Sequence, residues 1–155
     1  MGVDPAGDDV ELQGERGRAR VSARDWPVLR VELAGRIDPD LTRQWHDAYL
    51  EIVGRKAERY VYVIDGTPGG ELPPTSRRVI AEFLAQHRGD DSLMRLHVGS
   101  IYVLPSALLR GVATAVFWVQ QPDYRWKFAS KLAEAEAIAK GWLAEERIAW
   151  RGFGR

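Results

Sequence analysis

The chain of 155 residues contains no cysteine, which excludes disulfide bonds, thiolate metal sites and cysteine nucleophiles. It also lacks a charge excess, because 22 basic side chains balance 22 acidic ones, so nothing favours a nucleic-acid or anionic-membrane partner. No apolar run reaches the roughly 18 residues of a membrane helix, and the acidic N-terminus has no signal-peptide pattern. We therefore expect a cytoplasmic protein that binds neither nucleic acid nor membrane.

What is present is the composition of a globular domain, with 45% hydrophobic and 28% charged residues. A chain of this length can bury a core without disulfides or metals. We divide it into a flexible tail over residues 1–16, an α/β domain over 17–144 and a C-terminal extension over 145–155. The tail is expected to be mobile because its acids and glycines offer little to bury.

The run Tyr60–Asp65 predicts a central strand. Its β-branched and aromatic residues follow one another without polar alternation, which is typical of a strand covered on both faces, and the Gly/Pro cluster at 66–70 ends it. Nearer the N-terminus, Arg18–Ala23 has the pattern of a short edge strand with outward arginines. A turn connects it to a strand beginning at Val28, which predicts an antiparallel hairpin.

Four helices complete the predicted domain. The first begins with Asp38 as N-cap and Pro39 at the first helical position, and it buries one apolar stripe. Two further strands are expected at 97–104 and 124–128, and the other three helices at about 75–87, 106–119 and 131–144. This order predicts the α/β class, with a single mixed sheet of about five strands and four helices.

The third helix is apolar nearly all round. One interpretation is that it lies wholly inside the core. However, a sheet has two faces with one layer of helices each, so part of this helix should remain uncovered. We therefore predict a partner or homodimer interface, because such contacts use aromatic anchors with apolar neighbours. Its residues are Leu109, Val112, Val116, Phe117 and Trp118.

No catalytic pattern is complete. Asp65-Gly66-Thr67 resembles the phosphohydrolase motif Asp-x-Asp-Gly-Thr, but Val63 stands where the nucleophile would be, so Asp65 is better interpreted as ending the strand and bonding the loop. The glycine-rich loop has no lysine to reach a phosphate. His46, expected off the buried stripe, His87 and His97 lack metal-ligand spacing. We therefore predict no enzyme activity, no metal and no cofactor.

The order of elements resembles the STAS fold of anti-sigma-factor antagonists. The resemblance rests on the Asp65 ending of the middle strand, the loop into a helix at Thr75-Ser76 and the late strand before the last helix. Val103–Gly111, followed by Tyr124-Arg125 and Phe128, is closer to divergent bacterial STAS-like proteins grouped with Sec-fourteen-type lipid carriers. The resemblance to the STAS fold covers about Arg18 to Leu143. It implies a mixed sheet and regulation through protein contacts.

The family carries a phosphorylated Ser or Thr at the start of the helix after the middle strand. Here that place reads Pro74-Thr75-Ser76-Arg77, without the usual preceding Asp or following Gly. Thr75 and Ser76 are thus either phospho-acceptors or ordinary helix N-caps. Arg77 and Arg78 oppose the helix dipole, so they either bind an anion or acidic partner or are simply solvated.

Two functions stay open. The first is a non-catalytic interaction module in bacterial signalling, which contacts a protein partner, such as a kinase or regulator, through the region 66–78 and forms a homodimer. The second is a small-ligand or lipid-binding domain, with an apolar pocket between the sheet and the third helix.

Overall fold

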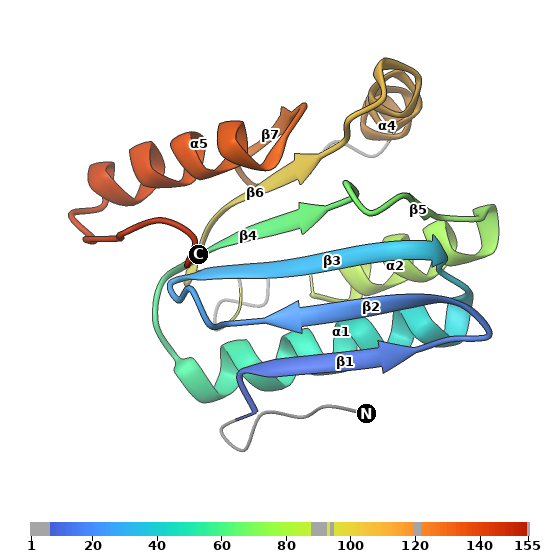
Figure 1. Ribbon diagram of the computed structural model, residues 1–155, viewed down its shortest axis with the longest axis horizontal. Helices are drawn as coiled ribbons and strands as arrows, with labels where there is room; N and C mark the ends of the chain where they lie inside the picture. The colour runs from blue at the N-terminus through green and yellow to red at the C-terminus, as the bar shows by residue number, and fades with distance from the viewer. Residues whose placement is uncertain (1–6, 88–92, 94, 120–121, 155) are drawn as a thin grey trace.

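The computed structural model describes residues 7–87, 93, 95–119 and 122–154. Within α4 the side chains at 108, 112, 115, 116, 118 and 119 also lie outside the description. The described chain forms one mixed sheet with helices on both faces (Figure 1). The strands are β1 (Asp9–Gln13), β2 (Arg16–Ser22), β3 (Val28–Arg36), β4 (Tyr60–Asp65), β5 (Gly70–Glu71), β6 (His97–Val103) and β7 (Trp126–Ala129). The helices are α1 (Pro39–Lys56), α2 (Pro74–His87), α4 (Ala107–Val119) and α5 (Leu132–Glu145).

The sheet confirms the predicted α/β class. Its strand order is β1-β2-β3-β4-β6-β7, and β5 pairs with the end of β3. The β1–β2 and β2–β3 pairs are antiparallel, whereas β3–β4, β4–β6 and β6–β7 are parallel. Strand β4 lies between β3 and β6, as predicted. The described sheet has seven strands instead of about five, because β1 and the short β5 join it.

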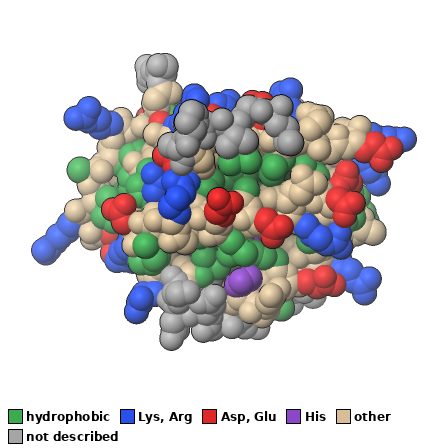
Figure 2. Space-filling model, turned by 90° about the horizontal axis from the view of Figure 1, so that it is seen from below, with side chains coloured by type: hydrophobic (Ala, Val, Ile, Leu, Met, Phe, Trp, Pro, Cys, Tyr) green, Lys and Arg blue, Asp and Glu red, His purple; other side chains and the backbone are tan. Residues whose placement is uncertain are grey.

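Strand β1 corrects two predictions at the N-terminus. Residues 9–13 are not a flexible tail, since they pair in register with β2 over their whole length. Val10 and Leu12 pack against the core beside α1, so the segment does have apolar side chains to bury. Strand β2 is consequently an inner strand, and β1 forms the edge. Figure 2 views the molecule from this β1 side, where hydrophobic side chains appear among charged ones.

Two acids at this end of the chain, Asp8 and Asp9, are ion-pair partners and not solvating charges. Asp8 lies 2.9 Å from Nη1 of Arg55 and 3.1 Å from Nζ of Lys56, both on α1. Asp9 is 5% exposed and accepts two hydrogen bonds from the Arg20 guanidinium, at 2.8 and 2.6 Å. These partners lie 11 or more residues away, and they fix the segment against β2 and α1.

The first core lies between the sheet and α1, with α2 beside α1. Helix α1 begins as predicted, because Oδ1 of the N-cap Asp38 accepts a 2.8 Å hydrogen bond from the Leu41 amide and Pro39 opens the helix. The buried side chains of this core are Ala19, Val21, Ala23, Leu29, Val31, Leu33, Ile37, Leu41, Trp45, Tyr49, Ile52, Val53, Tyr60, Ile64 and Leu93.

The prediction that His46 lies off the buried stripe of α1 is wrong. The ring is 8% exposed and packs between Trp45 and Phe83 of α2. Its Nδ1 lies 2.7 Å from the carbonyl oxygen of Thr42, which satisfies the ring nitrogen inside the helix. Burial lowers the pKa of His46, so the neutral ring serves as a packing residue between α1 and α2.

The second core lies on the opposite face, where α5 packs on β4, β6 and β7. The C-terminal extension folds back onto this core, with Trp150 and Phe153 packed against it. Nε1 of Trp150 donates to the carbonyl oxygen of Asp25 at 2.8 Å, which ties the extension to the β2–β3 turn. The buried members are Val28, Val61, Val63, Val98, Ile101, Val103, Ala129, Ala135, Ala139, Trp142 and Leu143.

Helix α5 covers only part of the sheet face on which it packs. Its contacts are with β4, β6 and β7, while the neighbouring half of the same face, formed by β1, β2 and β3, lies in the open in Figure 1. Alternate residues of β2 at this surface are the arginines Arg16, Arg18 and Arg20. We call this half of the sheet the open half, and the half under α5 the covered half.

Candidate functional site

The carboxyl ends of the parallel strands β3, β4, β6 and β7 meet at one edge of the sheet. Helices α2 and α4 both begin just beyond this edge (Figure 1). The loop 66–73 leaves β4 at this place, so the predicted contact region 66–78 lies where binding loops of open α/β sheets usually occur.

Asp65 fixes the start of the loop. The carboxylate is 2% exposed, and its Oδ1 accepts a 2.9 Å hydrogen bond from the Thr67 amide. Its Oδ2 lies 3.2 Å from Nη2 of Arg30, which supplies the opposite charge. This geometry confirms the interpretation that Asp65 ends the strand and bonds the loop.

The rest of the loop is braced by backbone hydrogen bonds. The Gly69 amide donates to the Gly66 carbonyl at 3.0 Å, and the Ile37 amide donates to the Glu71 carbonyl at 2.9 Å. Strand β5 then pairs with the last residues of β3. Gly69 has a φ of +91°, a backbone conformation that glycine adopts without a side-chain clash. The loop therefore presents an exposed tip at 67–69 on an ordered base.

Ser76 does not have either role predicted for it. Helix α2 begins at Pro74, so Ser76 lies within the first turn and is not the N-cap. The side chain is fully buried, and its hydroxyl donates to the carbonyl oxygen of Ile37 at 2.6 Å. A kinase cannot reach a hydroxyl in this position. Ser76 instead joins α2 to the chain segment that follows β3.

The neighbouring residues of α2 face solvent. Thr75, Arg77 and Arg78 are all exposed, and the first turn contains no acidic residue. The Arg78 guanidinium lies 3.8 Å from the carboxylate of Glu82, one helical turn further on. Both side chains are mostly exposed to water, so this ion pair neutralises little of the positive charge of Arg78. The start of α2 therefore adds two cationic side chains to the positive end of the helix dipole.

Two of the five residues predicted to form an interface on α4 have described side chains, and these two differ in their surroundings. Leu109 is 45% exposed, as a contact residue should be. Phe117 instead packs against the sheet, with ring centroids 5.3 Å from Tyr102, 4.8 Å from Trp126 and 5.9 Å from Phe128, so it anchors α4. The side chains of the other three predicted residues, at 112, 116 and 118, lie outside the described part of the chain.

Sequence reasoning missed a network of aromatic hydroxyl groups on the α1 face. All five tyrosines of the chain take part, and His97 and Trp45 join them. Nε1 of Trp45 donates to Tyr62 at 2.6 Å, the hydroxyls of Tyr102 and Tyr124 lie 2.6 Å apart, and the remaining hydroxyl pair is Tyr49 with Tyr60. The only available signal was the alternation of tyrosines along β4.

Burial controls the ionisation of this network. It raises the pKa of Tyr60 to about 12 and lowers the pKa of His97 to about 4. Nε2 of His97 lies 2.8 Å from the hydroxyl oxygen of Ser100, which is itself 3% exposed. The groups are thus neutral near pH 7, and they form a structural hydrogen-bond network.

Two further properties concern the described residues only. No three His, Asp or Glu side chains among them converge as metal ligands would. In the same part of the chain, no helix combines the length and the apolar character needed to cross a bilayer.

With this geometry established, comparison with known proteins identifies the fold. The chain is similar to the crystal structure of an uncharacterised protein of the DUF3478 family from Shewanella loihica PV-4, which has a SpoIIAA-like fold. The two share 14% sequence identity with a TM-score of 0.52 over 87% of this chain and 91% of the other. No protein-family model and no curated protein matches the chain. The chain therefore has the SpoIIAA-like, that is STAS-like, α/β fold, as the sequence pattern indicated.

Proposed function

We propose that the chain is a non-catalytic, STAS-like protein-interaction module in bacterial signalling or regulation. It binds a protein partner through the loop 66–73 and the start of α2. The observation that carries this proposal is the combination of an ordered loop base, an exposed tip and an exposed cationic helix start at one edge of the sheet.

The ordered base favours binding because little conformational entropy is lost when a partner docks. Hydrogen bonds from Ser76 and to Asp65 hold the loop and helix in place before contact. Arg77 and Arg78 favour a partner with an acidic patch, whose carboxylates would approach both the guanidinium groups and the helix dipole.

Thr75 is the residue through which a kinase would regulate the contact. It is exposed and lies between Pro74 and the buried Ser76. A phosphate here would add about two negative charges beside Arg77 and Arg78 and would neutralise the surface that an acidic partner recognises. Phosphorylation is therefore expected to release such a partner.

The test combines affinity capture from the native organism with measured binding of the protein recovered. The double variant R77E/R78E should bind that protein at least tenfold more weakly than the unmodified chain, and T75D should act in the same direction. The control is R43E on the exposed face of α1, which makes the charge change of one Arg→Glu substitution and is therefore matched to the single variants R77E and R78E. If R43E weakens binding as much as these single variants, the region 66–78 is not the contact.

Leu109 supports a second contact, between two copies of the chain. It is one of two large hydrophobic side chains exposed among the described residues, and it lies at the beginning of α4. We expect a dimer in light scattering at high concentration and a monomer for L109E. The matched change L84E, at the other exposed leucine, should leave the mass unchanged. A strict monomer for the unmodified chain would remove this contact from the proposal.

A ligand-binding domain is the second candidate function. The observation in its favour is the group of aromatic rings between α4 and the sheet, with Tyr102, Phe117 and Phe128 only partly buried. Native mass spectrometry of protein purified from its own organism tests this candidate. A co-purifying apolar molecule that F117A releases, while F83A on α2 retains it, would favour ligand binding.

A further inference from the structure

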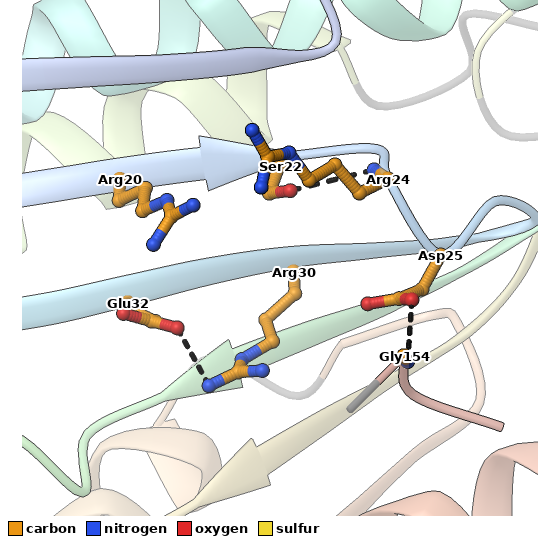
Figure 3. Close-up of a pocket in the computed structure, with 7 residues that line it drawn as sticks. All are labelled: Arg20, Ser22, Arg24, Asp25, Arg30, Glu32 and Gly154. Atoms are coloured by element: carbon orange, nitrogen blue, oxygen red, sulfur yellow. Dashed lines mark hydrogen bonds and ion pairs between the residues drawn. The ribbon is translucent and has the colours of Figure 1, made fainter. Parts of the chain in front are cut away.

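A depression of about 470 Å³ opens on the charged surface of the sheet, and none of its lining residues belongs to the loop 66–73 (Figure 3). Its walls come from β2, β3, the turn between them and the end of the C-terminal extension. The lining residues are Arg20, Ser22, Arg24, Asp25, Arg30, Glu32 and Gly154. Three guanidinium groups and two carboxylates thus surround one opening.

The side formed by β2 carries two cations that contact one carboxylate. Arg20 and Arg24 both pair with Asp9, at 2.6 and 2.9 Å. Glu11 and Glu32 lie opposite Arg20 on the neighbouring strands and also interact with its charge, so Arg24 is the cation that stays available. Arg24 contributes Nε to this contact and its side chain is 60% exposed, so its terminal nitrogens remain in reach of a ligand. The Ser22 hydroxyl lies beside them and accepts only a 3.3 Å hydrogen bond from the Arg24 amide among the described residues.

The side formed by β3 and the turn carries a surplus of negative charge. Arg30 is shared by two carboxylates, Glu32 at 2.6 Å and Asp65 at 3.2 Å. Asp25 adds a third carboxylate, and Oδ1 of this group accepts a 2.7 Å hydrogen bond from the Gly154 amide. In Figure 3 the Asp25 carboxylate stands across the depression from the guanidinium group of Arg20.

We propose that this depression binds a small zwitterion of the amino-acid or short-peptide type. The carboxylate of the ligand lies against Arg20, Arg24 and Ser22, and its ammonium group lies against Asp25, since Glu32 at the other end of the depression is already paired with Arg30. A ligand with only one charge would satisfy one side and face like charges on the other. Because the site is open to water, we expect affinities in the millimolar to high-micromolar range, weakened by salt.

The test uses three probes with one skeleton, followed by two-dimensional NMR of the labelled full chain. Glycylglycine carries both charges, N-acetyl-glycylglycine lacks the cation, and glycylglycinamide lacks the anion. We expect saturable shifts at residues 20–25 and 30–32 with glycylglycine, and binding about five- to twentyfold weaker with each of the other two probes. Equal binding of all three, or no shift in these residues, would overturn the proposal.

Two substitutions separate the sides of the site. R24Q removes the exposed cation, and D25N removes the anion while retaining an oxygen that accepts from the Gly154 amide. Each should weaken glycylglycine binding about five- to twentyfold, whereas R43Q and D40N, which make the same changes at an exposed pair on α1, should leave it unchanged. If a variant unfolds in its NMR spectrum, the probe series on the unmodified chain decides alone. Loss of partner binding at 66–78 would leave these shifts unaffected.

Discussion

The covered and open halves of the same sheet face are built in opposite ways. Under α5, Val61, Val63 and Ile101 are fully buried and belong to the same apolar core as Leu143. On the open half, the corresponding face of β2 and β3 carries Arg20, Arg30 and other charged side chains in ion pairs. The first arrangement contributes stability through apolar area, whereas the second contributes little stability and leaves chemical groups available for recognition.

The largest difference between the halves should appear when a buried side chain of α5 is truncated. L143A removes a fully buried side chain and should lower the free energy of unfolding by about 2–5 kcal/mol. Urea unfolding followed by circular dichroism measures this loss. The matched change on the open half is R18A, which should alter stability by less than about 0.5 kcal/mol. Similar effects of the two changes would refute the contrast.

The pH dependence should next distinguish the open half from the hydroxyl network on the α1 face of the sheet, to which His97 belongs. His97 on β6 has a folded pKa of about 4, below its ordinary value of 6.5, so the unfolded chain binds more protons between these values. Stability should therefore fall as pH drops from about 6.5 to about 4, by up to about 3 kcal/mol. H97Q should remove most of this slope, and the residual slope reports His46, whose pKa is also lowered by burial. An unchanged slope in H97Q would contradict this assignment.

Asp9, the buried acid on the open half, affects stability at a lower pH than His97 does. The hydrogen bond from Arg20 holds the pKa of Asp9 below 3.8, so the folded chain releases this proton more readily than the unfolded chain. Its stabilising contribution is present above the unfolded pKa and is lost as pH falls through the folded pKa. D9N should flatten the stability profile below about pH 4 and leave the profile between pH 4 and 6.5 as it is.

The contact between α5 and β6 should also tolerate no added volume. A Cβ atom at Gly99 would lie 2.5 Å from Cζ3 of Trp142 and 3.1 Å from the carbonyl oxygen of Arg125. G99A should therefore cost about 1–3 kcal/mol of unfolding free energy. The double variant G99A/W142L should lose less than the sum of the two single changes, because the ring no longer occupies that space. Full additivity would show that the clash is relieved elsewhere.

The smallest effect of breaking an ion pair is expected on the open half. R24Q removes one of the two cations that share Asp9, and this side chain is 60% exposed. The loss of unfolding free energy should be below about 1 kcal/mol and should shrink further in high salt. Thermal unfolding at two salt concentrations measures it. A loss above 2 kcal/mol would mean that the open half is as important for stability as the covered half.

The sequence predicted the central strand and the first helix well because their signals are local. The unbroken apolar run of β4 and the Asp38-Pro39 start of α1 are visible within a few residues. The segment of β1 was mispredicted because its acids are stabilised by Arg20 and by residues of α1, and such distant pairings leave no mark in a local pattern.

The candidate site was predicted only in part for a similar reason. Exposed Thr75 and Arg77 follow from their position at a helix start. Ser76 was misassigned because its partner, the carbonyl group of Ile37, lies 39 residues earlier in the chain. The depression lined by Arg24 and Asp25 needs the folded C-terminal extension beside it, which no spacing in the sequence indicates.

The ion pairs of β1 have a consequence for handling the protein in acid. When the carboxylates that hold this strand are protonated, its pairing with β2 weakens, and detachment would expose the unpaired backbone of β2 with Ala19 and Val21 beside it. A second molecule could then add its own strand in that place. Purification and storage above about pH 4, where these carboxylates stay ionised, should therefore keep β1 paired with β2 and prevent such strand exchange.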